Sequence, residues 1–589
     1  MMQYLLARSE ALFPLRGLPI VGALAFVAVT AWGAEAFDAA AFWSMDAIRK
    51  TPLDVEIIST KVDAGYRIDE MYFTSENTPD GPSRIYCPFA RPERLDKPVP
   101  IVLWLHPGGA HADPARTLWL AQMFKCAVLD LDWSGQWVPG PKEFTKWKGP
   151  GGNTYADQYN IASDLKGSSM YHIIIACRRA LDFAGEQPNL DTTRVCAVGG
   201  SWGSYLANLL AGVDDRVRYA YCGLGAGGIH EDSHGAIDSG VNALPPELRR
   251  QWIAAYDPGS YAPRIRASIC QEVCANDWFF WLGDALSAYD ALPGEKRLVI
   301  RPNSNHNQGG REIQSPLFDW PKYCLLGEKP FLDVAKGSLR CEGRRYIWRV
   351  TGGEAAGGTL WFSPGSPCWP ARYWLAVPGK KDGDHWMADL PADLAPLAGR
   401  AFVNVTDADG RVISSDLIGR QGIDPSTHAG PLWSGGAIWD TGAGADAWRP
   451  TGPGNHSGPP KPKVEVSPSG DLRIATTGTD KSFAVLTNSV ILASGHASAH
   501  AGLRLVVGGN GQPGVLTVIL QRNCGSLQEL DYSAEVKYGA SPTFVELPWS
   551  GFQAPAGAPK LPYPFDGLRL DGERSDNTLV TVEGIGFLR

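Results

Sequence analysis

The stretch Val195–Tyr205 restricts the fold more than any other part of the chain. It opens with a short strand-like run, turns through Gly199-Gly-Ser201-Trp-Gly203 and continues into an apolar segment with helical spacing. The two outer glycines are needed because a side chain at either position would clash where the strand meets the helix. The pattern Gly-x-Ser-x-Gly at such a turn holds a serine hydroxyl above the end of the strand. We therefore interpret Ser201 as a candidate nucleophile rather than an idle serine in a glycine-rich turn.

Strand-like and helical segments alternate between residues 37 and 329. Three opening strands are predicted at 55–62, 66–75 and 84–89. Buried strands are predicted at 99–105, 126–131, 195–198, 217–225, 267–274 and 297–301, with helices at 114–124, 164–184, 204–211, 280–291 and 314–325. This alternation predicts an α/β fold with a mostly parallel, doubly wound sheet. In such sheets ligands bind beyond the carboxyl ends of the strands. Two long irregular segments, 134–163 and 226–262, are predicted to act as lids there.

The candidate serine has partners of the right chemistry at two other strand ends. Asp277 follows the strand at 267–274, and His306 follows the strand at 297–301. A serine needs a base to take its proton, and an imidazole base needs an acceptor that fixes its tautomer. The chain order serine, acid, histidine is the one that this fold requires. We predict a catalytic triad of Ser201, Asp277 and His306, with a helix N-cap and a loop histidine as the simpler alternatives for the last two.

An oxyanion site is predicted from the backbone around the serine. One donor is the N–H of Trp202, the residue after the nucleophile, and the other is Gly109 or Ala110 in the turn after strand 99–105. Pro107 in that turn has no N–H to offer. His106 and His111 flank the same turn and are predicted to bind substrate. No cluster of His and Cys has the spacing of a metal site, so neither a metal nor another cofactor is expected.

Four motifs together resemble the α/β-hydrolase superfamily across roughly residues 50–329. They are His106-Pro-Gly-Gly109, Gly199-Gly-Ser201-Trp-Gly203, Asn276-Asp277-Trp-Phe-Phe280 and Pro302-Asn-Ser-Asn-His306. The last two motifs, with the run Tyr289–Lys296, resemble more narrowly the PhoPQ-regulated pathogenicity-related proteins and the acetyl xylan esterase-like group. Trp202 stands where glucuronoyl esterases carry an arginine. The resemblance implies an α/β-hydrolase fold and serine esterase activity.

The remainder of the chain is predicted to be all-β. Residues 330–422 show short strands with frequent turns, as in a small β-sandwich, and an Ig-like domain in this place also fits the resemblance. Residues 423–589 begin with a linker rich in Gly, Pro and Asp. The strands that follow resemble the galactose-binding-like jelly rolls of bacterial carbohydrate-active enzymes. A sandwich that only packs on the enzyme is the alternative for this unit.

The N-terminus predicts export from the cytoplasm. Residues 1–36 contain two arginines, an apolar run at 18–31 and a small-residue cleavage site, as in a secretory signal peptide. The run is short for a membrane span, so no stable span is expected after processing, although an uncleaved anchor is the alternative. We therefore expect a secreted or periplasmic protein, with the hydrolase domain at 37–329.

The net charge and the cysteine content of the chain narrow the class of protein further. The net charge of −8 and the lack of a basic run argue against nucleic-acid binding. Eleven cysteines are scattered along the chain. Cys196 and Cys222 are predicted to be buried thiols, Cys270 and Cys274 are too far apart along one strand to bridge, and pairing of Cys341 with Cys368 stays open.

Three functions are compatible with these features. The first is a serine esterase that removes acyl groups from a small-molecule or polysaccharide ester, in particular an acylated carbohydrate. The second is a serine peptidase of the prolyl-oligopeptidase or X-prolyl type. The third is a non-catalytic carbohydrate-binding protein on a hydrolase scaffold. The serine, acid and histidine at three strand ends favour the first.

Overall fold

The fold was analysed in a computed structural model. It describes residues 37–94, 97–137, 140–149, 155–225, 227–229, 233, 235, 240–306, 313–364, 368–392, 394–423, 438–439, 441–450, 463–467, 471–475, 482–490, 497–509, 513–524, 526, 528–562, 565–573 and 579–588. The predicted signal peptide at 1–36 lies outside these residues, as do parts of the predicted lids and most of the linker after residue 423. No helix in the described ranges is long and apolar enough to cross a membrane.

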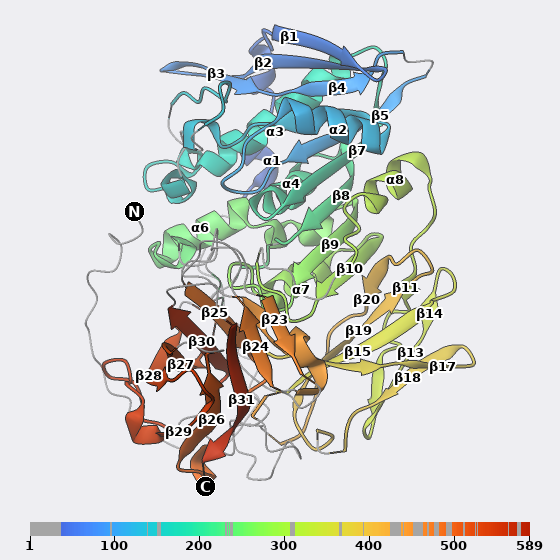
Figure 1. Cartoon of the computed structure of the whole chain (residues 1–589). Helices are drawn as coiled ribbons and strands as arrows, with labels where there is room; N and C mark the ends of the chain where they lie inside the picture. The colour runs from blue at the N-terminus through green and yellow to red at the C-terminus, as the bar shows by residue number, and fades with distance from the viewer. Residues whose placement is uncertain are drawn as a thin grey trace, which may run out of the picture. The chain divides into compact units, whose positions relative to one another are not determined.

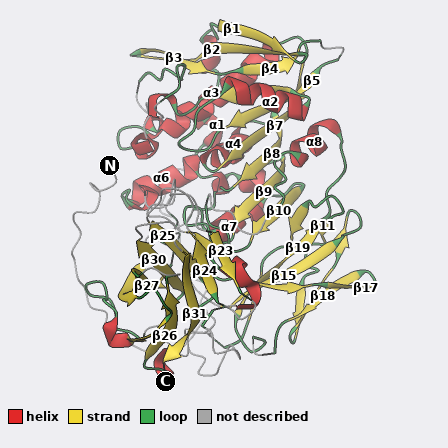
Figure 2. Cartoon of the chain, viewed as in Figure 1, coloured by secondary structure: helices red, strands yellow, loops and turns green. Residues whose placement is uncertain are grey.

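A ten-stranded sheet organises the first half of the described chain (Figures 1 and 2). Its order is β1-β2-β4-β6-β5-β7-β8-β9-β10, with β3 paired to β2. Strands β5 to β10 are parallel to one another, whereas the pairs β1-β2, β2-β4 and β4-β6 are antiparallel. This is the predicted α/β-hydrolase fold. The strands are β1 Glu56–Asp63, β2 Tyr66–Thr78, β3 Gly81–Tyr86, β4 Phe89–Pro92, β5 Val99–Leu105, β6 Ala127–Leu131, β7 Leu190–Gly200, β8 Val217–Gly223, β9 Ser268–Cys274 and β10 Lys296–Arg301.

Helices cover both faces of this sheet. Helices α2 and α8 share one apolar cluster with Val198 and Tyr221, while α3 and α4 pack against each other beside β7. Side chains define where helices begin: Asp113 accepts hydrogen bonds from the amides of Ala115 and Arg116 at the start of α2. The principal helices are α2 Pro114–Phe124, α3 Ser169–Glu186, α4 Trp202–Val213, α6 Pro246–Tyr256, α7 Leu282–Ala291 and α8 Asp319–Leu326.

The observed elements differ from the predicted ones in two places. The single strand predicted at 84–89 is two strands, β3 and β4, because Pro88 has no N–H to continue the ladder. The segment 226–262, predicted to be irregular, contains α6. Pro246 is the first residue of this helix, where a missing N–H costs nothing.

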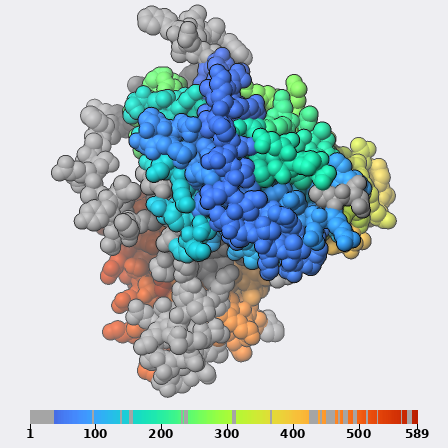
Figure 3. Space-filling model, turned by 90° about the horizontal axis from the view of Figure 1, so that it is seen from above, coloured from blue at the N-terminus to red at the C-terminus, as the bar shows by residue number. Residues whose placement is uncertain are grey.

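The outer strand of the sheet is strongly exposed. All eight residues of β1 are solvent-exposed, and Ile57 is 53% exposed. Figure 3 shows the first strands, in dark blue, running across this face of the molecule. The sheet therefore ends in an open edge on the side away from the candidate site.

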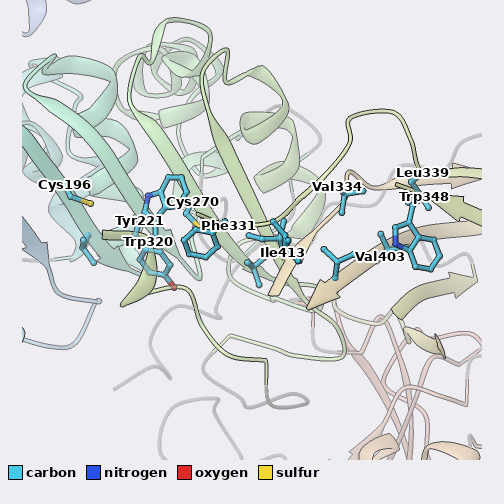
Figure 4. Packing of buried hydrophobic residues seen from close by; sticks show 14 of the residues in the cluster. Cys196, Tyr221, Cys270, Trp320, Phe331, Val334, Leu339, Trp348, Val403 and Ile413 are labelled. Carbon is cyan, nitrogen blue, oxygen red and sulfur yellow. The ribbon is translucent and has the colours of Figure 1, made fainter. Parts of the chain in front are cut away.

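The opposite edge strand, β10, is covered by the second β-region. The amide of Ile300 donates to Ser414 Oγ at 2.7 Å, and the Ile300 carbonyl accepts from Asn404 Nδ2 at 3.2 Å. One continuous apolar cluster runs from Tyr221 through Phe331 to Trp348, as Figure 4 shows. This packing removes an otherwise open sheet edge and ties the second region firmly to the hydrolase sheet.

Residues 333–420, called the first β-sandwich below, form the predicted all-β region after the hydrolase fold. It contains one sheet in the order β12-β13-β18-β17, another in the order β16-β15-β19-β20 with β21 on β19, and the short pair β11-β14. These strands are β11 Asp333–Val334, β12 Arg340–Glu342, β13 Arg345–Trp348, β14 Val350–Thr351, β15 Gly357–Pro364, β16 Leu375–Pro378, β17 Lys380–Asp382, β18 His385–Asp389, β19 Gly399–Thr406, β20 Val412–Ser414 and β21 Ile418–Arg420.

The C-terminal unit is a second β-sandwich. Its two five-stranded sheets, β22-β25-β30-β27-β28 and β23-β24-β31-β26-β29, are antiparallel and enclose one apolar core. The strands are β22 Arg449–Pro450, β23 Lys463–Val466, β24 Leu472–Ala475, β25 Ser482–Thr487, β26 Gly502–Gly508, β27 Gly514–Arg522, β28 Leu530–Tyr538, β29 Thr543–Pro548, β30 Gly567–Glu573 and β31 Leu579–Leu588. All eleven cysteines of the chain are free thiols, so Cys341 and Cys368 are not paired.

Candidate active site

Ser201 lies at the apex of a strained turn between β7 and α4. Its backbone has φ 53° and ψ −121°, a conformation that non-glycine residues rarely adopt. The turn permits no side chain on either side: a Cβ at Gly199 would lie 2.1 Å from Gly203 O, and one at Gly203 would lie 2.0 Å from Leu105 O. The backbone is held by a bond from Ser201 N to Gly223 O at 2.7 Å. Strand, turn and helix therefore fix the hydroxyl in one place.

The structure brings the three predicted triad residues into direct contact. Ser201 Oγ lies 2.8 Å from His306 Nε2, and His306 Nδ1 lies 2.8 Å from Asp277 Oδ2. Asp277 and His306 are 1% and 3% exposed, so both bonds are shielded from water. With the proton on Nδ1, the imidazole donates to the carboxylate and presents Nε2 as an acceptor to the serine hydroxyl. This is the hydrogen-bond chain that a serine nucleophile requires.

Local hydrogen bonds hold the acid in position. Asp277 Oδ1 accepts from the amides of Phe279 and Phe280, which leaves Oδ2 for the imidazole. Asp277 therefore caps the turn that follows it but is not a helix N-cap, because the N-cap of α7 is Trp281 and the helix begins at Leu282. The two roles use different oxygens and do not compete.

The loop that carries the histidine is fixed by a neighbouring amide side chain. Asn305 Oδ1 accepts from the backbone of His306 at 2.7 Å and from the backbone of Trp278 at 3.1 Å. The acid loop and the histidine loop are therefore joined directly. Asn305 belongs to the motif Pro302–His306, but its role as a link between the two loops was not predicted from the sequence.

Two further asparagines join these loops to the first β-sandwich. Asn276 Nδ2 donates to Pro370 O at 2.9 Å and to Arg372 O. Asn303 Nδ2 donates to Trp374 O, and Asn303 Oδ1 accepts from Trp374 N, both at 2.8 Å. Thus a segment about 70 to 95 residues further along the chain holds both loops that supply the acid and the base.

The predicted oxyanion donors lie at the two turns expected of them. Trp202 is the first residue of α4, so its N–H is at the electropositive end of a helix. Gly109 has φ 78°, which allows the turn after β5 to place its backbone close to a substrate. The Ala110 amide already donates to Pro107 O at 3.2 Å. Of the two alternatives in this turn, Gly109 is therefore the better placed donor.

The two predicted substrate-binding histidines differ in exposure. His106 is completely buried, stacks on Trp133 and bonds Pro107 O through Nδ1 at 2.9 Å. Its side chain lies inside the fold and supports the turn rather than facing a substrate-accessible surface. His111 is half-buried and keeps an accessible surface. The burial of His106, which directly follows an apolar strand, could not be predicted from its residue type.

No three His, Cys, Asp or Glu side chains are placed to hold a metal ion within the described ranges. The polar groups that meet at Ser201 are instead suited to acyl transfer: a serine hydroxyl, an imidazole that accepts its proton, a carboxylate behind it and backbone amides for an oxyanion.

Comparison with known proteins gives structural likeness only. No family model and no curated protein sequence matches the chain. Similar solved structures include an acetyl xylan esterase from Paenibacillus sp. R4, with 21% identity over 46% of this chain and 89% of that one and a TM-score of 0.37. Acetyl Xylan Esterase 1 from Thermoanaerobacterium sp. JW/SL YS485 has 17% identity, covers 48% and 92% of the two chains and gives a TM-score of 0.39.

A glucuronoyl esterase from Solibacter usitatus is also similar, with 12% identity over 46% of this chain and 84% of that one and a TM-score of 0.32. These proteins are carbohydrate esterases by name. Likeness at this level does not determine the activity of this chain.

Proposed function

We propose that the chain is a serine esterase that removes acyl groups from an acylated carbohydrate or related ester. The observation that carries this proposal is the pair of 2.8 Å contacts joining Ser201 to His306 and His306 to Asp277. Secretion, predicted from residues 1–36, is part of the proposal, and sequencing the N-terminus of the exported protein tests it. A mature protein that keeps residues 1–36 would contradict signal-peptide cleavage.

The reaction begins with attack of Ser201 Oγ on the ester carbonyl carbon while His306 Nε2 takes the hydroxyl proton. The Trp202 and Gly109 amides donate to the oxyanion that forms. As the tetrahedral intermediate collapses, the bond between the carbonyl carbon and the alcohol oxygen breaks, and His306 returns its proton to the leaving alcohol. Asp277 stabilises the imidazolium at each stage.

The second half of the cycle releases the acid. Water attacks the acyl-serine carbonyl while His306 Nε2 takes one of its protons, and a second oxyanion forms at the same amides. Collapse breaks the bond to Ser201 Oγ, which recovers its proton from His306. The products are one carboxylic acid and one alcohol, and the enzyme is unchanged.

Hydrolysis of 4-nitrophenyl acetate and of acetylated xylan by the wild type and by Ser201→Ala tests the proposal. We expect the substitution to lower kcat by at least 10³-fold and to abolish labelling by a fluorophosphonate probe. Hydrolysis by the Ser201→Ala protein at the wild-type rate would refute the mechanism. Cleavage of prolyl peptide anilides in preference to every ester would favour the peptidase alternative.

Sugar binding by the C-terminal β-sandwich remains a prediction, as does its identity as a galactose-binding-like jelly roll. Among the described residues of this unit, the exposed large hydrophobic side chains are Val515 and Phe544, with no exposed Trp or Tyr. Sedimentation of the full-length Ser201→Ala protein with insoluble polysaccharides tests the prediction. Absence of retention would leave the unit with a packing role.

A further inference from the structure

A cavity of about 440 Å³ lies at the carboxyl ends of the central strands, next to the candidate active site. Its lining includes Pro107 beside the oxyanion turn, Gly200 directly before the nucleophile and Asn305 directly before the base. Ligand pockets for molecules of drug size have volumes of roughly 300–1,000 Å³. The cavity is therefore much larger than an acetyl group needs and has room for a ring.

The residue at position 200 keeps this cavity open. A Cβ built at Gly200 would meet only Gly223 O, at 4.0 Å, whereas one at Gly199 would collide with backbone. The turn thus demands glycine at position 199 but not at position 200. A side chain at Gly200 would project into open space, and its absence leaves a flat backbone surface beside the nucleophile.

The rest of the wall is mainly apolar and aromatic. Trp104, Tyr221, Leu224 and Leu317 contribute to the lining, together with the backbone of Gly223. Flat backbone and aromatic rings match the faces of a planar group. A sugar ring would instead carry hydroxyls around its whole rim, and most of them would have no partner along such a wall.

One end of the cavity carries a buried ion pair. Glu272 is 2% exposed and accepts from Arg301 Nε, and its other oxygen accepts from the hydroxyls of Tyr221 and Ser315, each at 2.6 Å. The carboxylate is therefore fully satisfied, while the Arg301 side chain keeps 19% of its surface exposed. The described chain offers no hydrogen-bond acceptor to the two terminal nitrogens of Arg301.

We propose that this cavity binds the aromatic acyl group of the substrate, with Arg301 donating to oxygen substituents on the far side of the ring. A guanidinium with both terminal nitrogens available is suited to a pair of neighbouring oxygens, such as the hydroxyl and methoxyl groups of a hydroxycinnamate. The inference rests on the proposed esterase function and names its substrate class: esters of oxygenated aromatic acids in preference to acetate.

Binding is tested separately from turnover. Isothermal titration of full-length Ser201→Ala protein with methyl 4-hydroxy-3-methoxycinnamate measures affinity without hydrolysis. We expect binding, and at least a tenfold loss of affinity when Gly200→Leu is added. Gly357→Leu is the matched control, because a Cβ at Gly357 in β15 meets nothing within 4 Å, just as one at Gly200 meets only Gly223 O at 4.0 Å. Equal affinity with and without Gly200→Leu, or no binding at all, would overturn the proposal.

Arg301→Lys provides a second variant with a milder effect on packing, since it keeps the positive charge. We expect it to lower kcat/KM for the oxygenated ester at least fivefold relative to methyl cinnamate, which lacks the ring oxygens. An unchanged ratio would refute the assigned role of Arg301.

The two proposals fail in different ways. In one outcome, the wild type hydrolyses 4-nitrophenyl acetate but the Ser201→Ala protein binds no aromatic ester. This result would support the esterase proposal and refute the aromatic pocket. In the other outcome, the aromatic ester binds in a way that depends on Gly200, but the wild type hydrolyses no ester. This result would support the pocket and refute the esterase proposal.

Discussion

Replacing Asn303 with glycine tests whether the first β-sandwich positions the catalytic base. Asn303 has φ 50°, so an alanine would add backbone strain, whereas glycine adopts this conformation freely. Asn303→Gly thus removes the two 2.8 Å bonds to Trp374 and little else. Loss of each bond costs about 1 kcal/mol where water replaces the lost partner, and about 2 kcal/mol where a buried backbone group is left without a partner.

We therefore expect Asn303→Gly to lower the free energy of unfolding by about 2–4 kcal/mol. Because Asn303 lies three residues before His306, loss of these bonds also loosens the imidazole. A misplacement of about 1 Å can cost as much as about 10²-fold in rate. We expect kcat to fall by roughly 10- to 100-fold, with KM changed less than about twofold.

The assay is steady-state hydrolysis of 4-nitrophenyl acetate at a temperature where the variant remains folded, with urea unfolding measured in parallel. Asn523→Gly is the matched control, because Asn523 also has positive φ, at 53°, but lies in the C-terminal sandwich. Loss of stability by Asn303→Gly with an unchanged kcat would show that the contact is only structural and would refute the positioning role.

Three further predictions concern the turn, the acid and a buried carboxylate. Gly199→Ala and Gly203→Ala should each destabilise the fold by more than about 3 kcal/mol, since their Cβ atoms would lie within 2.1 Å of backbone oxygens, and soluble protein with the wild-type Tm would contradict this. Asp277→Asn should lower kcat by about 10³-fold or more through loss of the imidazolium partner; kcat on a short ester checks it, and a loss below tenfold would refute the role. Burial raises the pKa of Asp257 to about 7, so in the fold the carboxyl stays protonated up to a higher pH than in the unfolded chain. Stability should therefore fall as pH rises from about 4 to about 7, and urea midpoints at pH 5 and pH 8 should differ less in Asp257→Asn than in wild type; equal pH dependence would refute this.

The groups that meet at Ser201 were predictable because parallel strands place their carboxyl ends on one edge of the sheet. The strands before Ser201, Asp277 and His306 are short segments rich in apolar and β-branched residues, which the local sequence alone identifies as strands. Once they are taken to be parallel neighbours, the three side chains must converge. The strained turn at Ser201 was also predictable from the local sequence, because Gly199 and Gly203 lie two residues before and two residues after the serine.

The hydrogen bonds that hold the loops of Asp277 and His306 in place were not predictable, because they depend on pairing between distant segments. Nothing near Asn276 or Asn303 indicates that their partners are the carbonyls and amide of 370–374, which belong to another sheet. The same holds for Ser414 and Asn404, whose side chains cover the edge of β10. A polar side chain in a loop signals a hydrogen bond but not its partner.

The contrast between neighbouring glycines shows how structure changes the meaning of a motif. The motif Gly-x-Ser-x-Gly requires glycine at position 199 but leaves position 200 open. In the fold, a side chain at Gly199 would collide with backbone, whereas one at Gly200 would enter the cavity. Of these two glycines only Gly199 is required by the turn, whereas Gly200 leaves space beside the nucleophile. That space is where the difference between an acetyl and an aromatic ester would be decided.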